Sequence, residues 1–246
     1  METGADVIRL AVWSGPRNIS TALMRSWENR PDTVVIDEPL YAHYLMVTGL
    51  HHPGRAEVIG AGETDWRNVV ATLLGPVTCG AKVFYQKHMA HHLLPGMGRS
   101  WVARLANVML IRDPREVVAS YVRSRADVTA EDLGLPQQIQ LYDELLAAGA
   151  APPVIDARDF LLRPEPYLRA MCHHVGVEFT APMLAWPPGR RDSDGVWGRY
   201  WYEAVWKSTG FTEYRPRDPR LDRPAAAVAE ECLPMYQRLH EARWVL

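Results

Sequence analysis

Short, continuous apolar runs alternate with longer amphipathic segments along this chain, and this alternation restricts the possible fold more than any other feature. Strands are expected at residues 7–13, 33–36, 81–88, 106–111 and 152–156. Continuous apolar strands separated by helices are typical of a parallel sheet that is covered on both faces. The sequence therefore predicts an α/β fold with three layers, α/β/α, around a central parallel sheet.

The helices are predicted from apolar residues spaced three and four apart and from their end signals. The helical segments are residues 20–31, 65–76, 112–125, 136–150, 164–177 and 224–244. The first is expected to be capped by Ser20 or Thr21. The third has the best-defined start, with Asp113 as the N-cap and Pro114 as the first helical residue. Residues 48–63 have no helical pattern and are expected to form a mobile loop.

Composition limits the class of protein further. The chain has 246 residues, 48% of them hydrophobic and 23% charged, which is enough for a packed core. It has no internal repeat and no convincing linker, so we expect one domain over residues 1–246. The net charge of -2 argues against a nucleic-acid partner, and no apolar run reaches the ~18 residues of a membrane span. Cys79, Cys172 and Cys232 are odd in number and widely spaced, which fits a cytoplasmic location.

The first expected strand runs into the loop SGPRNIS and then into a helix. Ligands of open α/β sheets bind at the carboxyl ends of the strands, where a helix N-terminus also attracts anions. Arg17 adds a full positive charge there, although the loop lacks the lysine of a Walker A motif and any obvious magnesium site. The loop is a P-loop-like phosphate-binding candidate, and the alternative is an ordinary turn with a surface arginine. The candidate residues are Gly15, Pro16, Arg17, Asn18, Ile19, Ser20 and Thr21.

A second anion site is predicted where the strand 106–111 ends. Arg112 follows this strand directly, and Ser120 lies two turns along the next helix. An arginine and a hydroxyl at this position suit a phosphate group. The alternative is an exposed Arg112 that pairs with Asp113.

Two residues are candidates for a general base. His88 follows a strand and titrates near neutral pH, and Glu38 follows the strand 33–36. Glu38 could instead hold an arginine of the phosphate loop or cap a loop. His88, His91 and His92 could be surface histidines, and no metal site is expected because no carboxylate or cysteine completes a ligand set.

These segments resemble sulfotransferases that use 3′-phosphoadenosine-5′-phosphosulfate (PAPS). Residues 16–21 (PRNIST) are similar to the P-K-S-G-T-T loop of that family. Arg112 and Ser120 reproduce its second signature, an arginine with a serine eight residues later. The run QKHMAHHLLP puts His88 at the family's K-T-H-L-P histidine, and DEPLY around Glu38 resembles the glutamate segment of other branches. The resemblance covers roughly residues 7–180 and is diffuse beyond.

The resemblance implies transfer of a sulfuryl group from PAPS to a hydroxyl or amine of a small, partly apolar acceptor, without a metal. Adenosine 3′,5′-bisphosphate would be the product. His88 or Glu38 would be the base, and Arg17 would stabilise the leaving phosphate. The sequence departs from the family pattern at Ile19, which replaces a loop glycine, and at Gln86, which replaces a lysine.

The family's R-K-G motif is also missing near the C-terminus. Arg190, Arg191 and Gly195 are its expected counterparts, so that Gly195 would contact the donor. Seven aromatic residues are expected on the acceptor side: Tyr41, Tyr44, Phe84, Tyr85, Trp197, Trp201 and Trp206. A kinase or other nucleotide-phosphate enzyme on a related P-loop fold, and a non-catalytic nucleotide-binding protein, remain as alternatives. A homodimer is compatible with the sequence.

Overall fold

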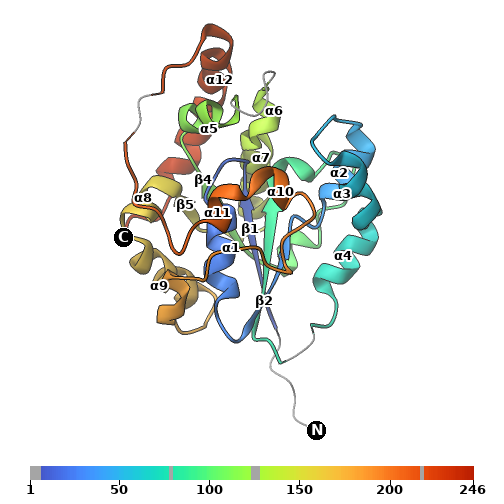
Figure 1. The fold of residues 1–246 in the computed structure, drawn as a ribbon, viewed down its shortest axis with the longest axis vertical. Helices are drawn as coiled ribbons and strands as arrows, with labels where there is room; N and C mark the ends of the chain where they lie inside the picture. Colours follow the sequence, from blue (N-terminus) through green and yellow to red (C-terminus); the bar gives the residue numbers. More distant parts are fainter. Residues whose placement is uncertain (1–6, 78–79, 123–127, 217–218) are drawn as a thin grey trace.

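The computed structural model describes residues 7–77, 80–122, 128–216 and 219–246, so Cys79 and the end of the predicted helix 112–125 lie outside the described residues. It contains a five-stranded sheet in the order β2-β3-β1-β4-β5, in which every pairing is parallel (Figure 1). The strands are β1 (Ile8–Ser14), β2 (Thr33–Asp37), β3 (Val83–Met89), β4 (Ala106–Ile111) and β5 (Val154–Asp156). The predicted parallel α/β fold is confirmed.

Helices connect and cover the strands. The α-helices are α1 (Ser20–Glu28), α2 (Tyr41–Thr48), α3 (Arg55–Ala61), α4 (Trp66–Leu74), α5 (Pro114–Tyr121), α6 (Ala130–Leu133), α7 (Leu135–Ala147), α8 (Ala157–Leu162), α9 (Pro164–His174), α10 (Gly198–Trp201), α11 (Glu203–Trp206) and α12 (Arg223–Glu241). Three short 3₁₀ helices are η1 (Ala90–His92), η2 (Val102–Arg104) and η3 (Ala181–Leu184).

The two faces of the sheet carry separate apolar cores, because successive side chains of a strand point to opposite faces. Leu10 and Val12 of β1 pack with residues of α1 and α9 on one face. Ala11 and Trp13 pack with residues of α4, α7 and α12 on the other. Helices therefore cover both faces, as the three-layer prediction requires.

Two local predictions about loops and caps are wrong. Residues 48–63 do not form a mobile loop throughout, because α3 occupies Arg55–Ala61 and packs on α2 through the buried Val58. Ser20 and Thr21 do not cap α1, since both lie inside the helix and its N-cap is Ile19. The start of α5 agrees with the prediction: Asp113 accepts a hydrogen bond from the backbone N–H of Arg115 at 2.8 Å.

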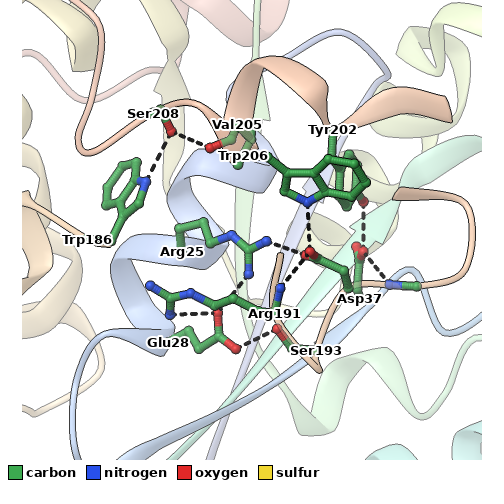
Figure 2. Close-up of polar contacts among 12 residues, drawn as sticks. Arg25, Glu28, Asp37, Trp186, Arg191, Ser193, Tyr202, Val205, Trp206 and Ser208 are labelled. Carbon is green, nitrogen blue, oxygen red and sulfur yellow. Dashed lines mark hydrogen bonds and ion pairs between the residues drawn. The ribbon is translucent and has the colours of Figure 1, made fainter. Parts of the chain in front are cut away.

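A long segment near the C-terminus lies across the end of the sheet toward which the strands point. We call residues 186–215 the C-terminal strap; it contains α10 and α11 and is orange in Figure 1. An ion pair fixes it to α1, since Arg25 Nη2 lies 2.5 Å from Asp194 Oδ1 and Arg25 is almost fully buried. Figure 2 shows this contact, together with the bonds from Arg191 and Ser193 to Glu28 of α1. The strap is thereby held above the carboxyl ends of the strands.

Candidate active site

A cavity of about 550 Å³ lies between the carboxyl ends of the strands and the C-terminal strap. This is the edge at which open α/β sheets bind ligands, and the volume is in the range of small-molecule sites. Its polar and charged lining residues are Arg17, Asn18, Thr21, Glu38, Tyr41, His52, Lys87, His91, His92, Arg112, Glu116, Ser120, Tyr121, Tyr202, Thr212, Glu213, Tyr214 and Arg215.

One end of the cavity brings together the two predicted anion sites. Arg17 Nε donates a hydrogen bond to Ser120 Oγ at 3.0 Å, and Arg112 Nη1 donates to the backbone oxygen of Arg17 at 2.9 Å. Thr21 of the first turn of α1 lines the same space. The first-turn N–H groups of a helix have no acceptor within the helix, so this end combines two guanidinium groups with backbone donors. We call it the cationic end.

Arg112 pairs with Glu116 and not with Asp113, which the alternative interpretation of this arginine expected. Glu116 Oε2 lies 2.8 Å from Nη2 and 3.0 Å from Nε of Arg112. The other oxygen of Glu116 accepts a hydrogen bond from the hydroxyl of Tyr214 at 2.7 Å. The Glu116 carboxylate therefore links Arg112, which precedes α5, to Tyr214 of the C-terminal strap.

At the second end of the cavity, three polar side chains surround one ammonium group. Lys87 Nζ lies 2.8 Å from Asp37 Oδ1, 2.5 Å from Glu38 Oε1 and 2.9 Å from the hydroxyl of Tyr202. That hydroxyl donates to Asp37 Oδ2 at 2.7 Å and accepts from Trp197 Nε1 at 3.1 Å. Glu38 thus contacts Lys87 and not an arginine of the phosphate loop. We call Asp37, Glu38, Lys87 and Tyr202 the ammonium cluster.

Burial changes the acidity of this cluster. The pKa of Glu38 is raised because burial disfavours its charged form and the Asp37 carboxylate adds like-charge repulsion, against the opposing effect of Lys87. Burial lowers the pKa of Lys87, but the two carboxylates outweigh it and the net direction is upward. Lys87 therefore stays protonated, and Glu38 is more basic than an exposed glutamate.

Two residues of the cavity have strained backbones. Among the described residues, the non-glycine residues with positive φ are Arg17 at 55° and Glu38 at 40°. Such conformations are uncommon for residues with a Cβ atom and are enriched at functional sites. Both side chains line the same cavity.

His88 does not lie in this cavity, which corrects the expectation that it faces the reacting group with Glu38. Its ring stacks on Trp13 with a centroid distance of 4.1 Å, and its Nε2 lies 3.2 Å from Gln86 Oε1. Burial, with a smaller contribution from Lys87, lowers the pKa of His88 to about 3. Successive residues of β3 face opposite sides of the sheet, so Lys87 reaches the cavity and its two neighbours pack toward α4.

Several predicted donor residues also lie outside the main cavity. Gly15 packs so closely on the backbone of Leu133 that a Cβ atom would lie 2.1 Å from its oxygen. Ser20 is buried and is not among the lining residues, which do include Pro16, Asn18, Ile19 and Thr21. Gly195 packs against the Trp197 ring, where a Cβ atom would lie 2.2 Å away.

The expected counterparts of the R-K-G motif therefore make contacts within the strap or with α1, and they do not line the cavity. Arg191 bonds Glu28 at 2.9 Å, and Arg190 lies over the ring of Trp206, with its guanidinium carbon 4.3 Å from the ring centroid. The cation that the strap places at the cavity is Arg215, which sequence reasoning missed.

The aromatic wall is different from the predicted set. Of the seven predicted aromatic residues, Tyr41 and Trp201 line the cavity; the others are not among its lining residues, and Phe84, Tyr85 and Trp197 lie in the cores. Three histidines join the wall: His52, His91 and His92. The ring of His92 stacks on Tyr41 at 4.7 Å, and burial lowers its pKa well below the usual value. The stacked pair of His92 and Tyr41 is therefore uncharged at neutral pH.

No group of three or more His, Cys, Asp or Glu side chains in the described part of the chain could hold a metal ion. Likewise, within those residues no helix combines the length and apolarity that crossing a membrane requires.

Sequence reasoning missed Lys87, Asp37 and Tyr202. A detectable signal existed for the first two, since a lysine and an aspartate interrupt the carboxyl ends of two apolar strands that pair in register. Tyr202 gives no local signal, because it reaches Lys87 from 115 residues further along the chain.

Comparison with known proteins agrees with this architecture. A family model described as a sulfotransferase domain matches residues 8–243. Two solved structures share the fold. A sulfotransferase from Alicyclobacillus acidocaldarius aligns over 98% of both chains, with a TM-score of 0.56 and 12% identity. The sulfotransferase domain from the curacin biosynthetic pathway covers 92% of this chain and 97% of that one, with a TM-score of 0.51 and 14% identity.

Curated relatives add sequence similarity over nearly the same range. Branched-chain-amino-acid aminotransferase-like protein 1 of Arabidopsis thaliana is 36% identical over 228 residues, and the corresponding protein 2 is 34% identical over 229 residues. Each alignment covers 92% of this chain but 40% of the relative, so the chain spans about two-fifths of their length. Because the family model covers almost the whole chain, this protein belongs to the sulfotransferase domain family.

Proposed function

We propose that the protein transfers a sulfuryl group from PAPS to a hydroxyl or amine of a small, partly apolar acceptor. One observation carries the proposal: a single cavity joins a cationic end, with Arg17, Arg112 and Ser120, to a carboxylate with raised pKa at Glu38. Family membership supports the reaction class.

The cationic end fits a donor with two separated phosphate groups. Arg17 and the first turn of α1 would hold the 5′-phosphosulfate, whose phosphate gains charge as the S–O bond breaks. Arg112 and Ser120 would hold the 3′-phosphate, and Arg215 of the strap adds a further cation. A PAPS donor supplies an activated sulfuryl group and a stable leaving phosphate.

Glu38 is the base in this proposal. An acceptor hydroxyl loses its proton to the Glu38 carboxylate as its oxygen forms a bond to sulfur, and the sulfur–oxygen bond to the 5′-phosphate breaks. The raised pKa of Glu38 suits this role, because a base close to the working pH transfers protons most efficiently. His88 is not proposed as the base, because its ring lies outside the cavity lining.

The acceptor would lie against the wall of Tyr41, His92 and Trp201, next to Glu38. Flat, largely uncharged side chains favour a planar or partly apolar acceptor over a highly charged one.

Calorimetric titration with adenosine 3′,5′-bisphosphate, AMP and ATP tests the donor site. The bisphosphate should bind more tightly than AMP, because only the bisphosphate reaches Arg112 and Ser120. Turnover of PAPS with a panel of phenols, alcohols and amines then tests the activity. Equal binding of AMP and the bisphosphate contradicts the donor assignment. ATP binding with hydrolysis favours the kinase-like alternative, and bisphosphate binding without turnover favours the non-catalytic one.

Replacing Arg112 gives a sharper form of this test. Charge-assisted hydrogen bonds contribute about 1.5–3 kcal/mol, so Arg112→Ala should weaken bisphosphate binding roughly ten- to a hundredfold and leave AMP binding nearly unchanged. Arg115→Ala is the matched control, because Arg115 is an exposed arginine three residues further along, in the first turn of α5, and outside the cavity lining. Equal losses for both nucleotides would place Arg112 away from the 3′-phosphate.

A further inference from the structure

The ammonium cluster contains one more carboxylate than the proposed reaction uses. Glu38 is the base, and Lys87 is its cationic partner, but Asp37 bonds the same ammonium and lies almost completely buried. Burying an additional carboxylate costs free energy unless it has a specific role or partner. Asp37 is therefore a residue whose contribution needs an explanation.

The geometry shows that the two carboxylates contact the same positively charged group, the Lys87 ammonium. Asp37 Oδ1 and Glu38 Oε1 lie 2.8 and 2.5 Å from the same Lys87 nitrogen. Two carboxylates that bond one nitrogen come within the ~4–6 Å range in which like charges affect each other's ionisation. Without Asp37, no like-charge repulsion would oppose the attraction between Lys87 and the Glu38 carboxylate. The ionised form of Glu38 would then be favoured.

Position in the fold fixes this arrangement. Asp37 is the last residue of β2 and pairs in register with Lys87 of β3, while Glu38 follows in a strained conformation with φ of 40°. Tyr202 of the strap then donates a hydrogen bond to the second oxygen of Asp37, Oδ2, at 2.7 Å. Figure 2 shows Tyr202 reaching Asp37.

We infer that Asp37 is a positioning residue whose carboxylate shares the Lys87 ammonium, so that Glu38 remains basic enough to take the acceptor's proton. This inference rests on the proposed function of Glu38 as the base. Four groups face Glu38: Lys87 from β3, Asp37 from β2, Tyr202 from the strap and Tyr41 from α2. Among these groups, Asp37 repels and Lys87 attracts the negative charge of Glu38.

The direct test is the titration of Glu38 in the donor-free protein. Carboxyl carbon NMR of protein labelled at glutamate follows this residue, and Glu38→Gln assigns its signal. Asp37→Asn should lower the pKa of Glu38 by about one unit or more, because a like charge is removed and Lys87 remains. An unchanged or raised pKa would overturn the inference.

Control variants separate charge from structure. Asp143→Asn removes one charge from an exposed ion pair with Arg238 on the far helices and should leave the Glu38 titration unchanged. Tyr202→Phe keeps both carboxylates and Lys87 but removes the hydroxyl, so the pKa of Glu38 should not fall. A fall in Tyr202→Phe equal to that in Asp37→Asn would show that packing, and not charge, controls Glu38. If Asp37→Asn does not fold, the wild-type titration still tests the inference, because a Glu38 pKa at or below the ordinary value of 4.5 would overturn it.

Turnover distinguishes failure of the inference from failure of the proposed function. If Glu38 is the base, the acidic limb of kcat/KM in Asp37→Asn should move to lower pH, in step with the NMR titration, and the plateau rate should fall. If the NMR pKa moves while the acidic limb stays in place, Glu38 is not the base and the proposed function loses that role. If neither moves, the inference about Asp37 is wrong.

Discussion

Glu38 combines three properties that rarely occur in one glutamate: a positive φ, a short bond to a buried ammonium and a raised pKa. A strained backbone persists only where surrounding contacts determine it, and here Lys87 and Tyr202 supply those contacts. The same residue lines the cavity together with Arg17. At the scale of single residues, Glu38 is therefore the side chain best placed to exchange a proton with an acceptor.

Glu38→Gln should reduce kcat/KM about 10²–10⁴-fold, which is the usual contribution of a general base. In the wild type, kcat/KM should fall as the pH drops through the pKa of Glu38, which lies above the ordinary value of 4.5. The variant should lose this acidic limb. Initial rates across pH, with bisphosphate affinity measured in parallel, check the prediction; a retained limb would assign the base to another group.

His88→Gln should change acid stability and not the base step. His88 is neutral in the folded protein, with a pKa of about 3, while the unfolded chain takes up a proton near 6.5. The wild type should therefore lose stability as the pH falls from about 6.5 toward 3, by at most about 1.4 kcal/mol per pH unit from this group. The variant should lose less over that interval. Urea unfolding at several pH values measures the difference, and parallel curves would contradict it.

At the scale of elements, polar contacts with α1 help to fix the C-terminal strap. Asp194 accepts bonds from Arg25 Nη2, the backbone of Arg191 and Trp206 Nε1 at 2.5, 3.0 and 2.9 Å. Arg25 also contacts Glu28 of its own helix at 3.2 Å. Figure 2 shows how these bonds hold the strap against the helix that follows the phosphate-type loop. The same strap carries Tyr202 and Tyr214, which line the cavity.

Asp194→Ala should loosen the strap while leaving the sheet intact. Removing one partner of a buried ion pair costs about 3–5 kcal/mol when no other partner remains, and the remaining Glu28 should reduce that loss. Backbone amides of the strap should exchange hydrogen faster, whereas amides of β1 and β3 should not. Hydrogen-exchange mass spectrometry measures both regions.

Glu203→Gln is the control for this experiment. It breaks the exposed Glu203–Lys207 ion pair within the same strap, and exposed pairs contribute little to stability. Exchange rates like those of the wild type are expected. If Glu203→Gln loosened the strap as much as Asp194→Ala, the ion pair with Arg25 would not be what holds it.

At the scale of the whole molecule, the cavity joins parts from both halves of the chain, so ligand binding should stabilise the folded state. Bisphosphate at a hundred times its Kd should add about 2.7 kcal/mol. For a chain of this size, that corresponds to a rise in Tm of roughly 5–10 °C. AMP at the same concentration should give a smaller rise. Differential scanning calorimetry measures both, and equal rises would contradict two separate phosphate sites.

Much of the fold could be predicted because each strand is recognisable from its local sequence. The apolar runs at 7–13 and 106–111 need only neighbouring residues to be recognised, and their alternation with helices predicts the parallel sheet. The short helices α3, α10 and α11 could not be predicted in this way, since each has too few residues to display a period.

Site residues could be predicted where they directly follow a strand. They could not be predicted where the direction of the side chain decides whether a residue reaches the cavity. Arg17 and Glu38 were identified from their places after strands, and both line the cavity. The sequence points to His88, but its neighbour Lys87 lines the cavity, because a shift of one residue along a strand exchanges the two faces of the sheet. Tyr202 depends on the long return of the strap, which no local pattern contains.

The late position of Tyr202 in the sequence has a consequence for biosynthesis. All five strands end by Asp156, so a chain emerging from the ribosome can pair its whole sheet before the strap has been synthesised. At that stage Lys87 and Asp37 are already adjacent through strand pairing, but the hydroxyl that bonds both is still missing. Pairing of the strands and completion of the reactive cavity are therefore separable in time, and the second waits for translation of a segment that adds no strand to the sheet.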